Sequence, residues 1–248
     1  MGTIDILNCF TCNARIPSHW HCGTTALLVE TRQGLALVDT GLGTEDYIQG
    51  SGILNVFRII TRVPLDPQEA AVRQIARLGY QPEDVRHVVL THMHFDHCGG
   101  LPDFPDAKVH VHRRELEAFT GRPRQLSDLA YVRRHIAHRP DWQIYEETGE
   151  KWYDFDAIRL PFDPIMWLVP LYGHTRGHCG VAVQIGDGWL LQAGDAAALF
   201  NQEAPDWLIK FALGPHQPRL GAFAASHPEV RVVTGHNWLD WYEENKRG

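Results

Sequence analysis

The chain has 248 residues, of which 44% are hydrophobic and 21% are charged, and its formal net charge is −7. A chain of this length and composition can bury a large core, so we expect one compact domain over residues 1–248. The acidic balance argues against a surface that binds nucleic acid and favours a soluble enzyme acting on a small molecule.

No apolar run approaches the roughly 18 residues of a membrane span, and the first residues lack the basic and apolar regions of a signal peptide. We therefore expect a cytoplasmic protein that does not associate with a membrane. Its five cysteines are an odd and sparse set, unlike the even framework of a disulfide-stapled secreted protein. Reduced thiols are expected.

The first predicted element is a β-hairpin. Short β-branched runs at 25–30 and 34–39 enclose a Gln-Gly turn, which is typical of two antiparallel strands. The stretch 41–65 contains several glycines, and we expect it to be mainly loop.

A helix is predicted after this stretch. In the run Asp-Pro-Gln-Glu (66–69), aspartate is a favourable N-cap, proline suits the first helical position and glutamate lies at the third. The residues that would form its apolar face are Ala71, Ile75 and Leu78. Gly79 is expected to end the helix.

Strands and helices alternate in the following part of the chain. Strands are expected at 87–91 and over Val109–His112, and Leu129, Val132 and Ile136 have the spacing of an amphipathic helix within 126–138. From about residue 157 onward the apolar runs are strand-like and punctuated by glycine, with a helix expected near 216–226. This order predicts the α/β class.

Four predicted strands run directly into residues that commonly bind metals. The strands and the residues that follow them are 87–91 with His92, 167–173 with His174, 189–194 with Asp195, and 230–235 with His236. Since side chains at the ends of neighbouring strands converge in space, one site assembled from four distant segments is expected.

The first of these residues opens a dense cluster, His-Met-His-Phe-Asp-His-Cys-Gly-Gly (92–100). Its ligand-type residues are His92, His94, Asp96 and His97. The two glycines give the backbone freedom to turn tightly. Imidazole and carboxylate hold zinc, iron or manganese, and a catalytic pair of ions needs about six or seven ligands. A lone histidine is usually only hydrogen-bonded, but this cluster and the three later segments together predict a metal centre.

In these ordered motifs, from Val38-Asp39-Thr40-Gly41 to Thr-Gly-His236, the sequence resembles the metallo-β-lactamase-fold hydrolase superfamily. The resemblance implies a four-layer αβ/βα sandwich of two mixed β-sheets, with the site along one edge between the sheets. It also implies two divalent metal ions, with zinc as the first expectation and iron or manganese as alternatives.

The resemblance further implies a role for each ligand. The first ion would be held by His92, His94 and His174, the second by Asp96, His97 and His236, and Asp195 would bridge them. Asp39 would support ligand histidines through hydrogen bonds. His178, four residues beyond His174, is a further candidate for such support.

The expected chemistry of this centre is hydrolysis. A water shared by two cations has its pKa lowered from about 15.7 toward roughly 7, so a bridging hydroxide could attack an ester-like substrate at neutral pH. Asp96 is the candidate for carrying a proton to the leaving group. No Gly-x-Ser-x-Gly motif, which would indicate a serine nucleophile, occurs in the sequence.

Three segments look most like the branch of the superfamily that opens N-acyl-homoserine lactones. They are the 44–66 loop, the stretch 77–85 and the block 92–100. A lactone or related ester is therefore the expected substrate. Those lactonases usually place a substrate-touching tyrosine three residues beyond the bridging aspartate, where this sequence has Ala198. β-Lactamase activity is not expected, because the antibiotic-destroying enzymes typically lack that aspartate and are exported.

Other reactions remain as alternatives. A thioesterase of the glyoxalase II type is one, although only twelve residues follow His236, too few for the C-terminal substrate-binding helices of that enzyme. A phosphodiesterase is another, and segment 113–139 has seven arginines against three acidic residues, which we interpret as a solvated helical face. A different class is an iron-dependent oxidoreductase of the sulfur dioxygenase type. Di-iron flavoprotein relatives usually carry glutamate where His94 stands.

Two further groups of histidine and cysteine are interpreted without chemistry. One group, whose spacing is too irregular for a clear zinc site, consists of Cys9, Cys12, His19, His21 and Cys22. The other, His135 and His138, lies beside several arginines and is expected on a solvated face. The sequence does not indicate the oligomeric state.

Overall fold

The computed structural model describes residues 3–14, 20–50, 52–61, 66–197, 210 and 212–236. Within them the chain forms two six-stranded β-sheets. The first contains, side by side and in this order, β1 (Ile4–Ala14), β2 (Trp20–Thr31), β3 (Gly34–Val38), β4 (Val85–Val89), β5 (Lys108–His112) and β6 (Asp141–Tyr145). The second contains, in this order, β12 (Val230–Val233), β11 (Gly188–Gln192), β10 (Cys179–Ile185), β9 (Met166–Pro170), β8 (Phe155–Leu160) and β7 (Glu150–Trp152).

Both sheets are mixed. Strands β1 to β3 pair antiparallel and β3 to β6 pair parallel, whereas in the second sheet β12 and β11 are parallel and the other neighbours are antiparallel. The predicted first hairpin is β2 and β3, in which Thr31 lies opposite Gly34. Gly34 has a φ of 109°, a backbone conformation that favours glycine.

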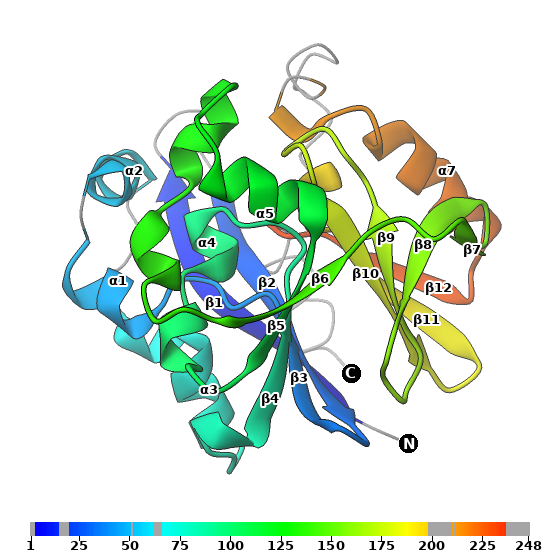
Figure 1. Ribbon diagram of the computed structural model, residues 1–248, viewed down its shortest axis with the longest axis horizontal. Coiled ribbons are helices and arrows are strands. Elements are labelled where there is room, and N and C mark those ends of the chain that lie inside the picture. The colour runs from blue at the N-terminus through cyan, green and yellow to red at the C-terminus, as the bar shows by residue number, and fades with distance from the viewer. Residues whose placement is uncertain are drawn as a thin grey trace.

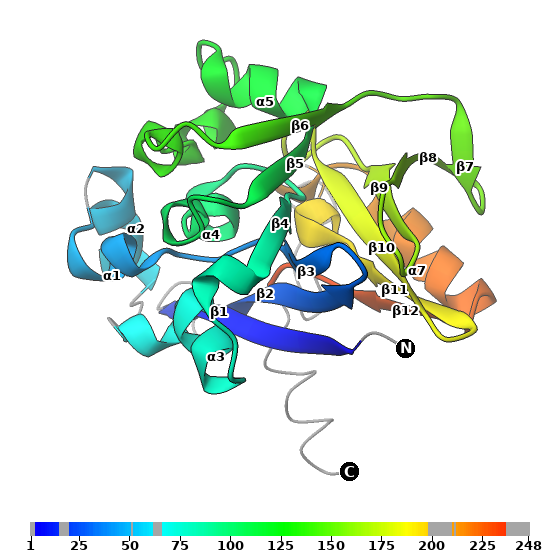
Figure 2. The same cartoon turned by 60° about the horizontal axis from the view of Figure 1, so that its bottom comes forward.

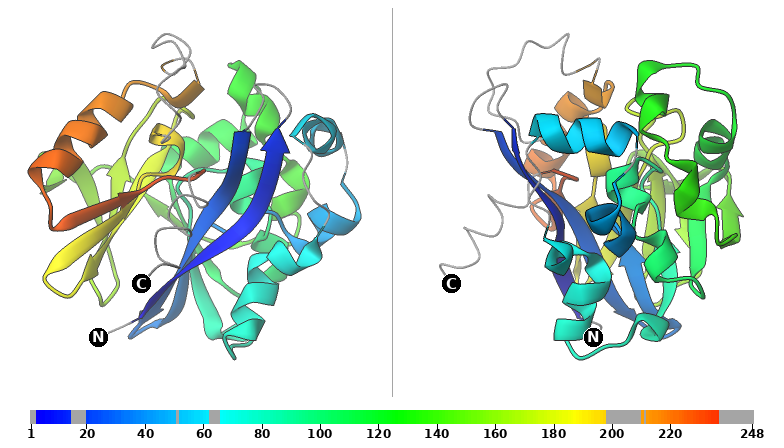
Figure 3. Two further views of the ribbon diagram at one scale, coloured as in Figure 1. Left: turned by 180° about the vertical axis from the view of Figure 1, so that it is seen from behind. Right: turned by 90° about the vertical axis from the view of Figure 1, so that its left-hand side faces the viewer.

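Helices cover the outer face of each sheet. The α-helices are α1 (Thr44–Ile48), α2 (Ile53–Thr61), α3 (Ala71–Arg77), α4 (Phe95–Cys98), α5 (Arg113–Thr120) and α7 (Gln217–Ser226). The 3₁₀ helices are η1 (Pro67–Glu69), η2 (Pro82–Asp84), η3 (Leu101–Asp103), η4 (Leu126–Ala130), η5 (Arg133–Ile136) and η6 (Gly194–Ala196). Helices α1 to α5 lie on the side of the first sheet and α7 lies on the side of the second, with both sheets between them (Figures 1 and 2). The rear view shows the same order of layers (Figure 3). This is the predicted four-layer sandwich.

The alternation of side chains along the strands explains the layers. Leu27 of β2 packs between the two sheets with Leu168 of β9, whereas its neighbour Leu28 packs outward in a cluster with Ile75 of α3. On the far side, Phe223 of α7 packs on the outer face of the second sheet. Because both faces of central strands such as β3 and β10 are buried, these strands carry nearly continuous apolar runs.

Most predicted elements are confirmed, but the stretch 41–65 is not simply a loop, because it contains α1 and α2. Leu54 of α2 is buried, whereas Ile48, Val56 and Ile59 are exposed. Apolar residues therefore lie on both the inner and the outer sides of this region, which conceals the one-sided pattern of an ordinary surface helix.

The helix predicted from residue 66 onward is interrupted. Asp66 does cap its start, since its carboxylate accepts a hydrogen bond from the backbone N–H two residues later at 2.9 Å. Ala70 has an extended conformation that separates η1 from α3. The Glu69 carboxylate accepts a hydrogen bond from the Thr11 hydroxyl at 2.6 Å, which diverts it from the expected capping role. Leu78 is 46% exposed and does not belong to the buried face.

The amphipathic helix predicted within 126–138 is wrong. The segment forms the two short 3₁₀ helices η4 and η5, and Leu129 is exposed. The prediction of a solvated His135 is also wrong, because its side chain is buried and its Nε2 donates a hydrogen bond to Asp46 at 3.0 Å. The isolated spacing of three apolar residues could not show this tertiary partner. His138 is half-buried.

Six of the seven arginines of segment 113–139 are exposed, as the interpretation as a solvated face predicts, although several of the arginines also have structural partners. The Arg133 guanidinium donates to the carbonyl oxygens of Thr120 and Gly121 at 2.9 and 2.7 Å. Arg134 pairs with the carboxylate of Asp46. These side chains fasten the connections around α5 rather than presenting an uninterrupted basic surface.

The predictions about the cysteines are tested in part. Cys9, Cys98 and Cys179 are free and buried. His19 and Ala198 lie outside the described residues, as do the side chains of Cys12, His21 and Cys22. Among the described helices, none has both the length and the apolarity needed to cross a membrane.

Candidate metal centre

The structure brings all seven predicted ligands together at one end of the sandwich, where β4, β9, β11 and β12 end. Their ligand atoms form three overlapping groups of three, and the atoms in each group lie within 4.8 Å of one another. The groups are His92, His94 and His174; His92, His97 and Asp195; and Asp96, His97 and His236. The group that includes Asp195 shares one histidine with each of the others, so Asp195 lies between them.

The turn after β4 supplies four of these side chains because it passes directly into the short helix α4. His94 has an extended conformation at the N-cap of this helix, which places Asp96 and His97 in its single turn. Gly99 and Gly100 have ordinary negative φ values of −60° and −80°. A Cβ atom on Gly99 would lie 2.4 Å from the carbonyl oxygen of Phe95. Close packing, and not the expected tight turn, is therefore the reason for glycine here.

Several of the converging atoms lack partners of their own. The Nε2 atoms of His92 and His97 and the Oδ1 atom of Asp195 are buried without a hydrogen-bond partner among the described residues. His97 Nε2 and Asp195 Oδ1 are 3.4 Å apart. An unsatisfied buried polar atom costs about 1–3 kcal/mol, and several at one point fit a site for divalent cations.

Hydrogen bonds on the other ring nitrogens fix three of the histidines. The Nδ1 atom of His97 donates to Asp39 at 3.0 Å, that of His174 to the carbonyl oxygen of Ala212 at 2.6 Å, and that of His236 to the carbonyl oxygen of Gly23 at 3.3 Å. Because these bonds hold a proton on Nδ1, Nε2 is the nitrogen of each ring that would bind a metal ion, in place of any proton that it carries.

Electrostatics at the site also favour cations. Burial, reinforced by the neighbouring His97, lowers the pKa of His92, so this ring is neutral and can act as a ligand. Burial also opposes a charge on His97, but the carboxylates of Asp195 and Asp96 outweigh it and raise the pKa of His97. The cluster thus stabilises positive charge between its carboxylates.

His178 holds the backbone of Asp195 in place. It is buried, and its Nε2 accepts a hydrogen bond from the backbone N–H of Asp195 at 3.0 Å. Gly194 has a φ of 53°, and a Cβ atom there would lie 2.6 Å from His178 Nε2. Glycine therefore permits the close approach that positions Asp195.

Sequence reasoning missed Glu115, which it had counted only as a charge on a solvated face. Glu115 is fully buried, and its carboxylate accepts hydrogen bonds from the backbone N–H of Met93 and from the hydroxyl of Thr175. The available signal was its spacing in α5, because Ala118 and Phe119, three and four residues later, are apolar and buried.

The residue between two of the candidate ligands belongs to the core. Phe95, between His94 and Asp96 in the sequence, packs edge-to-face against Phe57 of α2 with ring centroids 4.9 Å apart. Both belong to the cluster that includes Phe10 and Leu54. Helix α4 is therefore anchored in the core by an aromatic side chain.

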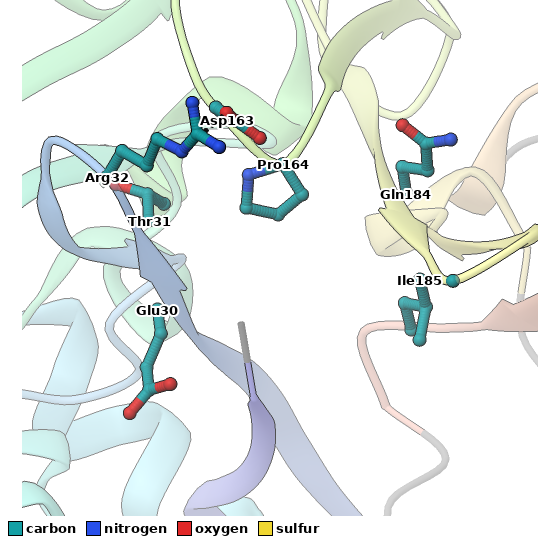
Figure 4. Close-up of a pocket in the computed structure, with 8 residues that line it drawn as sticks. Glu30, Thr31, Arg32, Asp163, Pro164, Gln184 and Ile185 are labelled. Carbon is teal, nitrogen blue, oxygen red and sulfur yellow. Dashed lines mark ion pairs between the residues drawn. The ribbon is translucent and has the colours of Figure 1, made fainter. Parts of the chain in front are cut away.

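A cavity of about 540 Å³ lies at the other end of the sandwich, away from the ligands. It is lined by Glu30, Thr31, Arg32, Asp163, Pro164, Gln184, Ile185 and Gly186. Arg32 and Asp163 form an ion pair of 2.9 Å on one wall, and Gln184 and Ile185 lie across from them (Figure 4). No predicted site residue lines this cavity.

Known proteins resemble this chain over most of its length. Residues 19–236 match the family model of the metallo-beta-lactamase superfamily. A probable metallo-hydrolase of Mycobacterium tuberculosis is 44% identical over 247 residues, covering 88% of this chain and 79% of the relative. The N-acyl homoserine lactonase AttM of Azorhizobium caulinodans is 30% identical over 229 residues, covering 86% of this chain and 81% of the lactonase.

Solved structures share the fold. A crystal structure of a Bacillus thuringiensis AiiA variant with N-decanoyl-L-homoserine at its active site matches with a TM-score of 0.71 and 21% identity, over 99% of this chain and 95% of that chain. Fold, ordered motifs and similarity to relatives agree, and the chain belongs to the metallo-beta-lactamase superfamily of metallo-hydrolases.

Proposed function

We propose that this protein is a dinuclear metal-dependent hydrolase that opens a lactone or a related ester of a small molecule. The observation that carries the proposal is the set of three overlapping groups of candidate ligands, to which seven side chains from four segments contribute. The similarity to proteins named metallo-hydrolase and N-acyl homoserine lactonase supports it.

The ligand set suggests how two ions would be held. One would be bound by His92, His94 and His174, the other by Asp96, His97 and His236, with Asp195 shared between them. We propose zinc, because imidazole and carboxylate donors without thiolates suit this ion, although iron and manganese accept the same ligands. When bound, two such cations lower the pKa of water and so supply a nucleophile at neutral pH.

The protein's own groups would orient this chemistry. Asp39 keeps His97 in one tautomer, and His178 holds the backbone of Asp195. The Asp96 side chain lies at the rim of the cluster, with one carboxylate oxygen 3.5 Å from His236 Nε2. We assign Asp96 the transfer of a proton to the leaving-group oxygen.

The substrate class is proposed from the relatives of the chain. Proteins named N-acyl homoserine lactonase are similar to it over most of its length, so a lactone or a related ester is the proposed class of substrate.

Asp96→Asn tests the proton-transfer assignment. Asparagine can still offer an oxygen to a metal but cannot carry the proton, so we expect turnover of a lactone to fall by about 100-fold or more. The metal content per chain should fall much less. The exposed Asp106→Asn is the matched control and should retain full turnover. Unchanged turnover in metal-loaded Asp96→Asn would remove Asp96 from this role.

A further inference from the structure

The buried Glu115 carboxylate connects the two loops that carry the ligands of one metal position. The first ligand loop, residues 91–94, follows β4 of the first sheet, and the second ligand loop, residues 173–178, follows β9 of the second sheet. We propose that Glu115 is a positioning residue that fixes the distance between these two loops and thereby sets the affinity for one of the two metal ions. The inference rests on the proposed dinuclear centre.

Each carboxylate oxygen of Glu115 has two donors. Oε1 accepts from the backbone N–H of Met93 at 2.8 Å and from the hydroxyl of Tyr131 at 3.0 Å. Oε2 accepts from the hydroxyl of Thr175 at 2.7 Å and from the backbone N–H of Gly177 at 3.2 Å. One oxygen therefore serves the first ligand loop, and the other serves the second.

The contacts fall next to the ligands themselves. Met93 stands between His92 and His94, and Thr175 directly follows His174. These three histidines form one of the ligand groups, and they come from both loops. A change in the separation of the loops would move His174 relative to the other two.

The second metal position depends less on this connection. Asp96 and His97 belong to α4, and His236 follows β12. The hydrogen bonds of Glu115 reach neither α4 nor the segment after β12. Loss of the carboxylate is therefore expected to weaken one ion selectively.

Close packing reinforces the connection to the second ligand loop. A Cβ atom on Gly177 would lie 2.1 Å from the backbone nitrogen of Glu115 and 2.6 Å from the carbonyl carbon of Arg114. The loop thus rests directly on the first turn of α5, where only glycine fits.

The chemistry of the side chain explains why glutamate is needed. All four donors are uncharged, so burial of the carboxylate is offset by hydrogen bonds alone. Glutamine has the same shape but only one acceptor oxygen. Whichever way its amide is turned, the NH₂ group faces the backbone N–H of either Met93 or Gly177, and one loop loses its bond.

The test is a metal titration of Glu115→Gln and the wild-type protein against a competing chelator, with zinc for affinity and cobalt(II) for the absorption spectrum. We expect the wild type to hold two ions per chain. The variant should hold one ion as tightly as the wild type and the other at least about tenfold more weakly, with altered cobalt absorption bands.

Asp46→Asn is the matched control. Asp46 is also a buried carboxylate in a hydrogen-bond network, with Gly43 and His135 as partners, but it accepts no bond from either ligand loop. This variant should lose stability yet keep both ions and the wild-type cobalt spectrum.

Two results would overturn the inference: wild-type affinity for both ions in Glu115→Gln, or the same loss of one ion in Asp46→Asn. If Glu115→Gln does not fold, Thr175→Val removes one bond to the second ligand loop and should weaken the same ion by a smaller factor. Unaltered binding in that variant would also count against the inference. Failure of the wild type to hold two ions would instead contradict the proposed dinuclear centre.

Discussion

Asp39 adopts a left-handed backbone conformation, with a φ of 57°, although it is neither glycine nor exposed. Such a conformation costs on the order of 1 kcal/mol and persists where the surroundings determine it. The Asp39 carboxylate accepts hydrogen bonds from the backbone N–H and the hydroxyl of Thr91 at 2.8 and 2.7 Å, and from His97. The strain therefore places one carboxylate where it orients a ligand ring.

Replacement of Asp39 by alanine should weaken metal binding. His97 would lose the acceptor that holds its proton on Nδ1, so we expect the affinity for one ion to fall by about 10- to 100-fold. Metal content after dialysis against a chelator measures this effect. Aspartate-to-alanine substitution at the exposed Asp106 should leave the metal content unchanged, and equal retention of metal by both variants would disprove the role of Asp39.

The convergence of the seven candidate ligands could be predicted from the sequence because each of their four segments follows an apolar strand, in motifs with a fixed order. Glu115 could not be identified in this way. A glutamate that follows two arginines in α5 has the local appearance of a surface residue. Its buried position depends on donors that lie 16 to 62 residues away along the chain.

The strands were predictable because short β-branched runs ended at clear turn signals. The helix expected within 126–138 was not, since the segment is held by tertiary contacts such as the bond between His135 and Asp46. Helix α3 shows the same limit. Asp66 was correctly predicted as an N-cap, but it caps η1, and α3 begins separately after Ala70, where Glu69 is bonded to β1.

Two glycines allow a test of how tightly α4 is packed. A methyl group on Gly99 would meet the backbone of Phe95, whereas Gly221 in the middle of α7 has open space around it. Gly99→Ala should destabilise the protein by about 1–3 kcal/mol through overpacking. Gly221→Ala should stabilise it by about 0.5–1 kcal/mol, because alanine favours the helix. Urea unfolding measures the change in unfolding free energy of both variants. A stabilising effect of Gly99→Ala as well would show that α4 is not tightly packed at this position.

A buried histidine network is expected to make the stability of the protein depend on pH. His110 Nε2 lies 2.9 Å from His87 Nδ1, and its Nδ1 lies 2.8 Å from the hydroxyl of Tyr145, which joins β4, β5 and β6. Burial lowers the pKa of His110 to about 3, and the positive charges of His87 and Lys108 act in the same direction. Histidine in the unfolded chain has a pKa near 6.5.

The sign of the effect follows from these two values. Between pH 6.5 and pH 3 the unfolded chain binds more protons at His110 than the folded protein does. The stability that neutral His110 contributes is therefore complete above pH 6.5 and is lost as the pH falls. From pH 7 to pH 5 the loss amounts to about 2 kcal/mol. His110→Gln should reduce the pH dependence of the unfolding free energy by this amount, and an unchanged slope would exclude His110 as its source.

We propose that two cations held by seven side chains make this protein a hydrolase. The decisive measurement is the metal content per chain by elemental analysis, combined with hydrolysis assays on a panel of lactones, thioesters and phosphodiesters. We predict two divalent ions per chain, loss of lactone hydrolysis when a chelator removes them, and recovery when zinc, manganese or iron is restored. Full hydrolysis by metal-free protein, or oxygen consumption without hydrolysis of any of these compounds, would contradict the claim.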